Sequence, residues 1–146
     1  NLRIPEEPLK FPFGWWIALL HLRAAGGQRI HRVGLGGAVG AMLRYLIGLV
    51  PVGASNGFPV KTLLINILGA FVIGVLAVLG EKHSLPPLLV LTLKTGVCGG
   101  FTTFSTFALE TSQLFQNGSY GLGIGYVCAS VILSIVAVQL ACLWLS

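Results

Sequence analysis

The sequence predicts an all-α integral membrane protein with four transmembrane helices, the third of them broken. Its residues are 55% hydrophobic and only 9% charged, whereas a soluble domain carries roughly 25% charged residues. Four apolar runs each approach the ~20 residues that cross a hydrocarbon core. The third run contains GGFTTFSTF at residues 99–107, and its glycines and hydroxyl side chains disfavour a regular helix.

We expect the four spans at residues 30–50, 60–80, 86–110 and 122–145. The segments between them are short and rich in turn-forming residues, which leaves no room for a soluble domain. Residues 30–146 are therefore predicted to form one compact bundle. A bundle of this size has little interior of its own, so we expect it to pair with a second copy.

Residues 1–29 differ from the rest and are predicted to be an interfacial extension. Three prolines fall in the first twelve positions, and the apolar stretch 13–22 is too short to span a bilayer. Trp15 and Trp16 are typical of the membrane interface. A signal peptide is the alternative, with a basic start and small residues after the apolar stretch.

Charge and motif content exclude several functions. The net charge of +5 comes from basic residues clustered near the N-terminus, which indicates contact with a membrane surface and no nucleic-acid binding. The three cysteines lie in apolar spans without metal-ligand spacing. The sequence has no catalytic triad pattern, paired carboxylates or phosphate-binding glycine loop, so we predict that it is not an enzyme.

Small residues follow one face of the first span. Gly36, Gly40, Arg44 and Gly48 are four residues apart, a spacing that lets helix backbones approach closely. Arg44 has two interpretations that the sequence leaves open. Its side chain either extends to the headgroups or attracts anions at a pore mouth.

Polar residues follow one face of two further spans. Thr62 and Asn66 share a face of the second span, and an asparagine amide can donate to an anion. Tyr126, Ser130 and Ser134 are four residues apart in the fourth span. Each alone is explained by bonding within the helix, but three hydroxyls on one stripe indicate a polar track.

The predicted break in the third span is the strongest functional signal. Irregular backbone at membrane depth persists where it is buried in protein or lines a water-filled cavity, and its free carbonyls and amides can bind ions. Phe104 and Phe107 flank the break, and their positive ring edges can meet an anion. Glu110 follows on the same face, and an acid inside a membrane is a functional candidate.

Three ordered motifs resemble those of the Fluc (CrcB) family of fluoride channels. They are GGAVGAMLRY at residues 36–45, TLLINILG at residues 62–69 and GGFTTFSTF at residues 99–107. The resemblance implies an antiparallel, dual-topology homodimer in the plasma (inner) membrane. It also implies passive fluoride export along two pathways and one central, structural sodium ion.

The resemblance further implies roles for individual residues. Main-chain carbonyls of Gly99 and Thr102 from both subunits would bind the sodium ion, and ring edges of Phe104 and Phe107 would contact fluoride. The implied partners are fluoride, sodium, membrane lipid and the second copy. The implied fluoride pathway consists of Arg44, Thr62, Asn66, Phe104, Ser105, Thr106, Phe107, Glu110, Tyr126, Ser130 and Ser134.

Three alternatives remain open from the sequence. A small proton-coupled multidrug transporter would need an acid in the first span, where this chain has Arg44 instead. A non-conducting scaffold would not need Asn66, a hydroxyl track and a broken helix together. Proton-coupled fluoride export through Glu110 is the third. The basic N-terminal flank also favours one orientation, so pairing with an oppositely oriented homologue is an alternative to the homodimer.

Overall fold

The computed structural model describes residues 14–51, 57–82 and 84–145, and all regular secondary structure in this part of the chain is helical. The prediction of an all-α fold is therefore confirmed. The elements are α1 (Gly14–Leu49), α2 (Val60–Glu81), α3 (Pro87–Leu91), the π-helix η1 (Thr92–Cys98), α4 (Gly99–Phe101), α5 (Phe104–Gln116) and α6 (Tyr120–Leu145).

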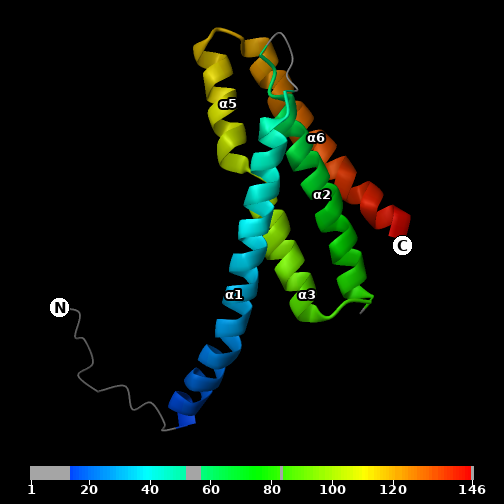
Figure 1. Ribbon diagram of the computed structural model, residues 1–146. Helices are drawn as coiled ribbons and strands as arrows, with labels where there is room; N and C mark the ends of the chain where they lie inside the picture. The colour runs from blue at the N-terminus through cyan, green and yellow to red at the C-terminus, as the bar shows by residue number, and fades with distance from the viewer. Residues whose placement is uncertain (1–13, 52–56, 83, 146) are drawn as a thin grey trace, which may run out of the picture.

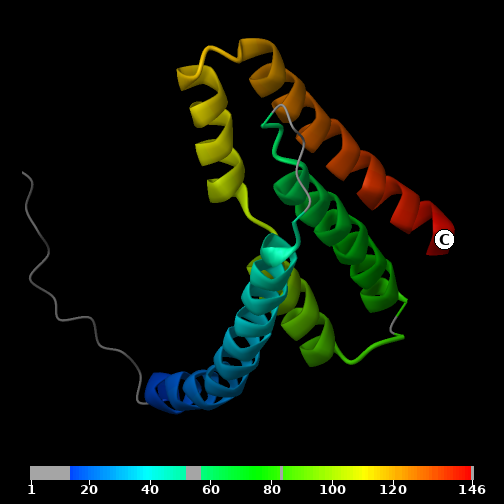
Figure 2. The ribbon, with the colours of Figure 1, turned by 45° about the horizontal axis from the view of Figure 1, so that its top comes forward.

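The helices form two packed pairs (Figure 1). The first pair is α2 and α6, which lie side by side and run in the same direction. The second is α1 with η1 and α4, which cross at close range. Figure 2 shows α5 extending away from this crossing to meet the start of α6. The junction between α4 and α5 thus lies near the middle of the molecule.

Three helical stretches of the described chain are long and apolar enough to cross a membrane. They are Val60–Glu81, Pro87–Gln116 and Tyr120–Leu145, with mean hydropathies of 2.6, 1.3 and 2.3. The second of these values is the lowest because this stretch contains the polar break. The expected first span is not among them, since Arg32 and Arg44 lower the hydropathy of α1. A fourth span therefore remains a prediction.

The start of α1 differs from the expected boundary at residue 30. The helix begins at Gly14 and continues without interruption through Leu49. Residues 14–29 of the expected extension thus belong to the same helix as the expected first span, while residues 1–13 lie outside the described part. Alanine, leucine and arginine make up eight of these sixteen residues and are good helix formers, which favours a helix despite three glycines.

Glycines allow α1 to approach η1 and α4 so closely that their backbones are in contact. A Cβ atom at Gly40 would lie 2.1 Å from the carbonyl oxygen of Val97, and one at Gly100 would lie 2.3 Å from that of Gly37. No side chain fits at these distances, so both positions require glycine. Gly36 and Gly40 of the predicted stripe form the α1 side of this contact, whereas Gly48 is exposed with open space around it.

The chain between α4 and α5 leaves the helical conformation for two residues. Thr102 has φ −76° and ψ 158°, and Thr103 has φ −149° and ψ 110°. Both are extended, so their backbone groups point away from a helical ladder. The amide of Thr102 still donates to the carbonyl of Cys98 at 3.0 Å, which leaves the groups of Thr103 to find partners elsewhere.

Candidate functional site

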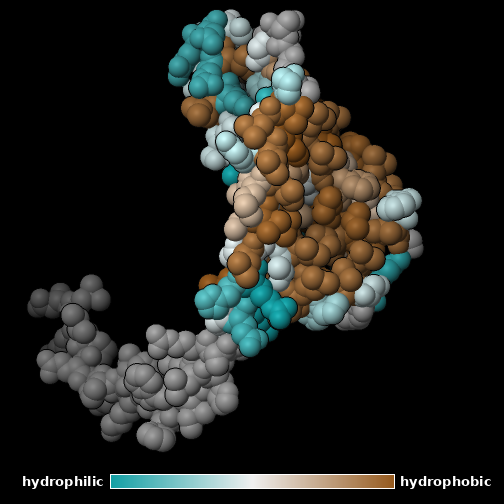
Figure 3. Space-filling view, in the orientation of Figure 1, coloured by the Kyte–Doolittle hydropathy of each residue, from teal (hydrophilic) through white to brown (hydrophobic). Residues whose placement is uncertain are grey.

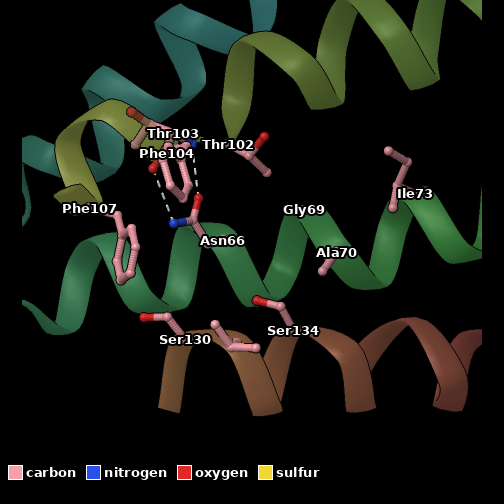
Figure 4. Close-up of a pocket in the computed structure, with 11 residues that line it drawn as sticks. Asn66, Gly69, Ala70, Ile73, Thr102, Thr103, Phe104, Phe107, Ser130 and Ser134 are labelled. Atoms are coloured by element: carbon pink, nitrogen blue, oxygen red, sulfur yellow. Dashed lines mark hydrogen bonds between the residues drawn. The ribbon is translucent and has the colours of Figure 1, made fainter. Parts of the chain in front are cut away.

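A cavity of about 350 Å³ lies beside the extended residues, between α2, α5 and α6. Figure 4 shows that side chains from all three helices point into it or line its wall. We call it the central cavity. Its lining consists of Asn66, Gly69, Ala70, Ile73, Thr102, Thr103, Phe104, Phe107, Ser130, Val131 and Ser134.

Asn66 pairs with the backbone that the break releases. Its Nδ2 donates to the carbonyl oxygen of Thr103 at 3.2 Å, and its Oδ1 accepts from the amide of Thr103 at 2.9 Å. The side chain thus replaces both bonds that Thr103 would make in a helix (Figure 4). Because Nδ2 carries two hydrogens, one donor remains beyond this pair. Asn66 is therefore a structural residue with spare donor capacity.

The side chain of Thr103 caps the N-terminus of α5. Its Oγ1 accepts from the amide of Thr106 at 3.2 Å, which is the N-cap interaction. The same oxygen donates to Thr106 Oγ1 at 2.9 Å and lies 3.4 Å from Ser105 Oγ. Ser105 and Thr106 are both exposed on this first turn and are not among the residues that line the cavity. In this chain their hydroxyls belong to the cap.

A row of aromatic rings runs along one edge of the cavity. The centroids of Phe104 and Phe107 are 5.5 Å apart, and those of Phe107 and Tyr126 are 5.1 Å apart. Phe58 meets Tyr126 edge to face at 5.5 Å. Tyr126 is fully buried, Phe107 is half-buried, and Phe104 is 79% exposed although it lines the cavity. The row therefore leads from the interior to the surface of the chain.

Glu110 is held by two of the predicted pathway residues. Thr62 Oγ1 donates to its Oε1 at 2.8 Å, and the Tyr126 hydroxyl donates to its Oε2 at 2.7 Å. The carboxyl also lines a smaller cavity of about 280 Å³ with Pro59 and Asn117, at the end of the molecule where α5 meets α6. Tyr126 thus contacts residues of both cavities. Its hydroxyl donates to Glu110 of the smaller cavity, and its ring contacts Phe107 of the central cavity.

Ser130 presents a buried hydroxyl to the central cavity. The side chain is 7% exposed, and within the described chain its Oγ atom has no hydrogen-bond partner. A buried polar atom without a partner costs free energy, so it marks a place where a ligand or water is expected. Ser134 lies one turn further along the same wall and is half-buried (Figure 4).

Arg44 and the two expected sodium ligands lie at or next to the break: Thr102 belongs to it and also lines the central cavity, and Gly99 precedes it by three residues. Arg44 is half-buried, and its Nη1 donates to the carbonyl oxygen of Thr102 at 3.4 Å. It therefore contacts the break itself and is not among the residues that line the central cavity. Gly99 is exposed, with open space where a Cβ would stand.

Five residues that line the central cavity were absent from the sequence-predicted set, namely Gly69, Ala70, Ile73, Thr103 and Val131. Thr103 pairs with Asn66 and caps α5. Threonine is a preferred N-cap residue, so the start of a new helix after the break could have identified Thr103 from the sequence. Gly69 lies opposite Thr102, where a Cβ atom would come within 2.2 Å of Thr102 Cγ2. The absence of a side chain at Gly69 therefore leaves room for the break.

Comparison with known proteins assigns the chain to a family. Residues 31–142 match the family model described as CrcB-like protein, Camphor Resistance (CrcB). The chain belongs to the CrcB-like family. The match contains each predicted pathway residue and both expected sodium ligands, whereas residues 1–30 lie outside it. The predicted family is therefore confirmed.

Three relatives named fluoride-specific ion channel FluC illustrate the similarity. The protein of Saccharophagus degradans is 46% identical over 110 residues, which are 75% of this chain and 83% of that protein. The protein of Ruminiclostridium cellulolyticum is 49% identical over 112 residues, covering 74% and 85%. That of Paracoccus denitrificans is 44% identical over 111 residues, covering 73% and 86%. Together with the apolar spans, this family makes the chain a multi-pass integral membrane protein.

Proposed function

We propose that this CrcB-like chain is a passive, fluoride-selective ion channel that exports fluoride across the plasma (inner) membrane. The observation that carries the proposal is the buried Ser130 hydroxyl, which has no partner in the described chain and faces the ring of Phe107 across one cavity. The names of the relatives, all fluoride-specific ion channels, support the choice of ion. The family is one of ion channels, so the chain is not an enzyme.

The cavity has the chemistry that a dehydrated fluoride ion requires. Fluoride is small and strongly hydrated, so a narrow pathway must replace its water with donors at each step. Ser130 and Ser134 supply hydroxyls, Asn66 has a second amide hydrogen, and phenylalanine rings supply positive edges. None of these is a buried cation that would trap the ion, and conduction requires binding that is also easily released.

The order of the groups suggests a route. An ion entering at the smaller cavity passes Glu110, to which both Thr62 and Tyr126 donate their hydroxyl hydrogens. It then passes Phe107 and Ser130, and next Ser134 and Phe104, from which it leaves the described surface. The carboxylate of Glu110 repels anions unless its charge is offset by the hydroxyls that donate to it, so this acid is a control point for entry.

An antiparallel pair of chains explains the exposure of Phe104. A phenylalanine that is 79% exposed beside a polar cavity leaves one side of the proposed pathway open in the single chain. A second copy packed against this face would close the pathway and shield the ring. The open space at Gly99 supports a close approach by a partner at the same level.

The carbonyls near the break fit a sodium ion shared by two chains. Hard cations prefer oxygen ligands, and the extended conformation of Thr102 turns its carbonyl away from a helical ladder. Gly99 and Thr102 would supply carbonyl oxygens from each chain, and the bound cation would offset repulsion between fluoride and nearby carbonyl dipoles. Arg44 donates to the same Thr102 carbonyl at 3.4 Å, and a carbonyl oxygen has a second lone pair that can bind the sodium ion.

Ion efflux from liposomes tests the proposed function. Vesicles that contain the purified chain are loaded with potassium fluoride or potassium chloride, and valinomycin is added to balance charge. We expect rapid release of fluoride and negligible release of chloride. Equal release of both ions, or no release from folded protein, would contradict the proposal, and the second result would leave the scaffold alternative.

Proton-coupled export is a second candidate, because Glu110 lies on the proposed route and is held by two hydroxyls. The same liposomes separate the two mechanisms. A channel releases fluoride at a rate set by the fluoride gradient and membrane potential alone. A coupled exporter would drive fluoride against its own gradient when a proton gradient is imposed.

A further inference from the structure

A second cavity, of about 580 Å³, lies at the end of the molecule opposite Glu110. It is formed between the N-terminal half of α1 and the start of the third membrane stretch, and we call it the α1–α3 cavity. Gln28 and Arg29 of α1 line one side, and Pro87, Leu88 and Leu91 of α3 line the other. One wall is thus polar and basic, and the facing wall is apolar.

The cavity lies where the apolar surface ends. Figure 3 shows the broad hydrophobic band of the molecule giving way to a hydrophilic patch along α1. Arg29, His31 and Arg32 are exposed in this part of α1. Leu88 and Leu91 belong to a stretch that is apolar enough to cross a membrane. The cavity therefore spans the boundary between the headgroup layer and the hydrocarbon layer.

The charge at this end favours an anion. In the described segments that flank the cavity, Arg29, Arg32 and Lys82 are basic and Glu81 is the one acidic residue. Basic pockets between membrane helices bind anionic lipid headgroups. An arginine suits a phosphate because its planar guanidinium can donate two parallel hydrogen bonds.

We propose that the α1–α3 cavity binds the headgroup of an anionic phospholipid. Arg29 and Gln28 donate to the phosphate oxygens, while Leu88 and Leu91 contact the glycerol backbone and the first acyl carbons. The apolar wall favours a lipid over a free anion, because a hydrated ion gains nothing from leucine side chains. The basic wall of Gln28 and Arg29 precedes the family match at residues 31–142, whereas the apolar wall lies within it. None of the five lining residues belongs to the proposed fluoride pathway, so the proposal does not depend on channel activity.

Native mass spectrometry of the full chain in detergent tests this site. The protein is titrated with dioleoylphosphatidylglycerol and, in parallel, with dioleoylphosphatidylcholine. We expect preferential binding of the anionic lipid, weakened roughly tenfold or more by Arg29→Gln, since a charged hydrogen-bonding group is lost. Arg32→Gln removes the same charge from the same helix outside the lining, and should weaken binding about fivefold at most. Equal losses in both variants would overturn the site in favour of diffuse surface attraction.

A charge-neutral pair of variants probes the apolar wall. Leu91→Trp fills the cavity, whereas Leu89→Trp adds the same ring at a 39% exposed position of α3 outside the lining. We expect the first variant to lose the preference for the anionic lipid and the second to keep it. Equal binding by the two variants would contradict the proposal. Displacement of the lipid by millimolar inorganic phosphate would also contradict it, since that result indicates a site for free anions.

Discussion

On the α2 and α5 side of the central cavity, polar groups are paired within the chain. Asn66 makes two hydrogen bonds to the backbone of Thr103, and Thr103 caps α5. On the α6 side, Ser130 is equally buried, but its hydroxyl finds no partner in the described residues. We call these surfaces the paired wall and the open wall.

The difference separates two uses of a polar residue inside a membrane. Satisfied groups of the paired wall hold an irregular backbone that would otherwise be unstable at this depth. An unsatisfied group on the open wall gives nothing to the fold and is available to a ligand. Substitutions of the hydrogen-bonded polar groups on the paired wall should therefore affect stability, and substitution of the unpaired hydroxyl on the open wall should affect fluoride flux alone.

The largest effect is expected for Asn66→Asp, which damages the paired wall and the pathway together. A carboxylate still accepts from the Thr103 amide but repels the Thr103 carbonyl, at a cost of about 1–3 kcal/mol in unfolding free energy. Its negative charge should also block fluoride efflux. Thermal unfolding in detergent and liposome efflux measure the two effects, with Gln116→Glu as the exposed control. Normal efflux by Asn66→Asp would remove this residue from the pathway.

Replacing both Phe104 and Phe107 with isoleucine should abolish fluoride efflux and leave the fold intact. Isoleucine is apolar and nearly as large but has no positive ring edge to meet an anion. Efflux should fall to the rate of empty liposomes, while the size-exclusion profile stays unchanged. Phe115→Ile, away from the cavity on the same helix, controls for the loss of a ring. Undiminished efflux from the double variant would refute the proposed ring-edge contacts.

Ser130→Ala should reduce fluoride efflux roughly tenfold or more, because a hydrogen bond to a charged group contributes about 1.5–3 kcal/mol. Its unfolding temperature should stay the same or rise slightly, since the variant removes an unpaired buried hydroxyl. Ser112→Ala, exposed on α5, is the matched control. A marked loss of stability in Ser130→Ala would show that the hydroxyl has a structural partner.

The smallest effect on flux is expected for Thr103→Ala, which removes the cap of α5. Loss of an N-cap side chain costs about 1 kcal/mol in unfolding free energy, and the backbone of Thr103 can still pair with Asn66. Thr103→Ser keeps the capping oxygen and should restore stability. If alanine and serine behave alike in thermal unfolding, the cap makes no measurable contribution.

Hydropathy predicted the ends of the regular spans well because burial in lipid dictates them. The expected 60–80 and 122–145 compare with Val60–Glu81 and Tyr120–Leu145 in the structure. The observed α1 begins at Gly14, sixteen residues before the expected start of the first span at residue 30, so helix and span do not share a start. Residues 14–29 still favour a helix although their hydropathy is lower than that of the following span. A prediction based on apolar runs alone therefore does not detect this part of the helix.

The sequence predicted some of the residues that line the central cavity, namely Asn66, Phe104, Phe107, Ser130 and Ser134, and none of their pairings. Spacing placed Tyr126, Ser130 and Ser134 on one face, and the last two line the cavity. The bond between Asn66 and Thr103 joins residues 37 positions apart, and no local pattern specifies such a contact. Local propensity also gave no signal for the π-helix η1, which depends on the close approach of α1 at Gly40.

The most direct test of the account is fluoride efflux and unfolding temperature measured together on Ser130→Ala and Thr103→Ala. Both residues are buried, both line the central cavity, and both variants remove one hydroxyl, although Thr103→Ala also removes a methyl group. The account predicts that Ser130→Ala loses most of its efflux with unchanged stability, while Thr103→Ala loses stability and keeps most of its efflux. Efflux that simply follows stability in both variants would contradict a fluoride-binding role for the open wall.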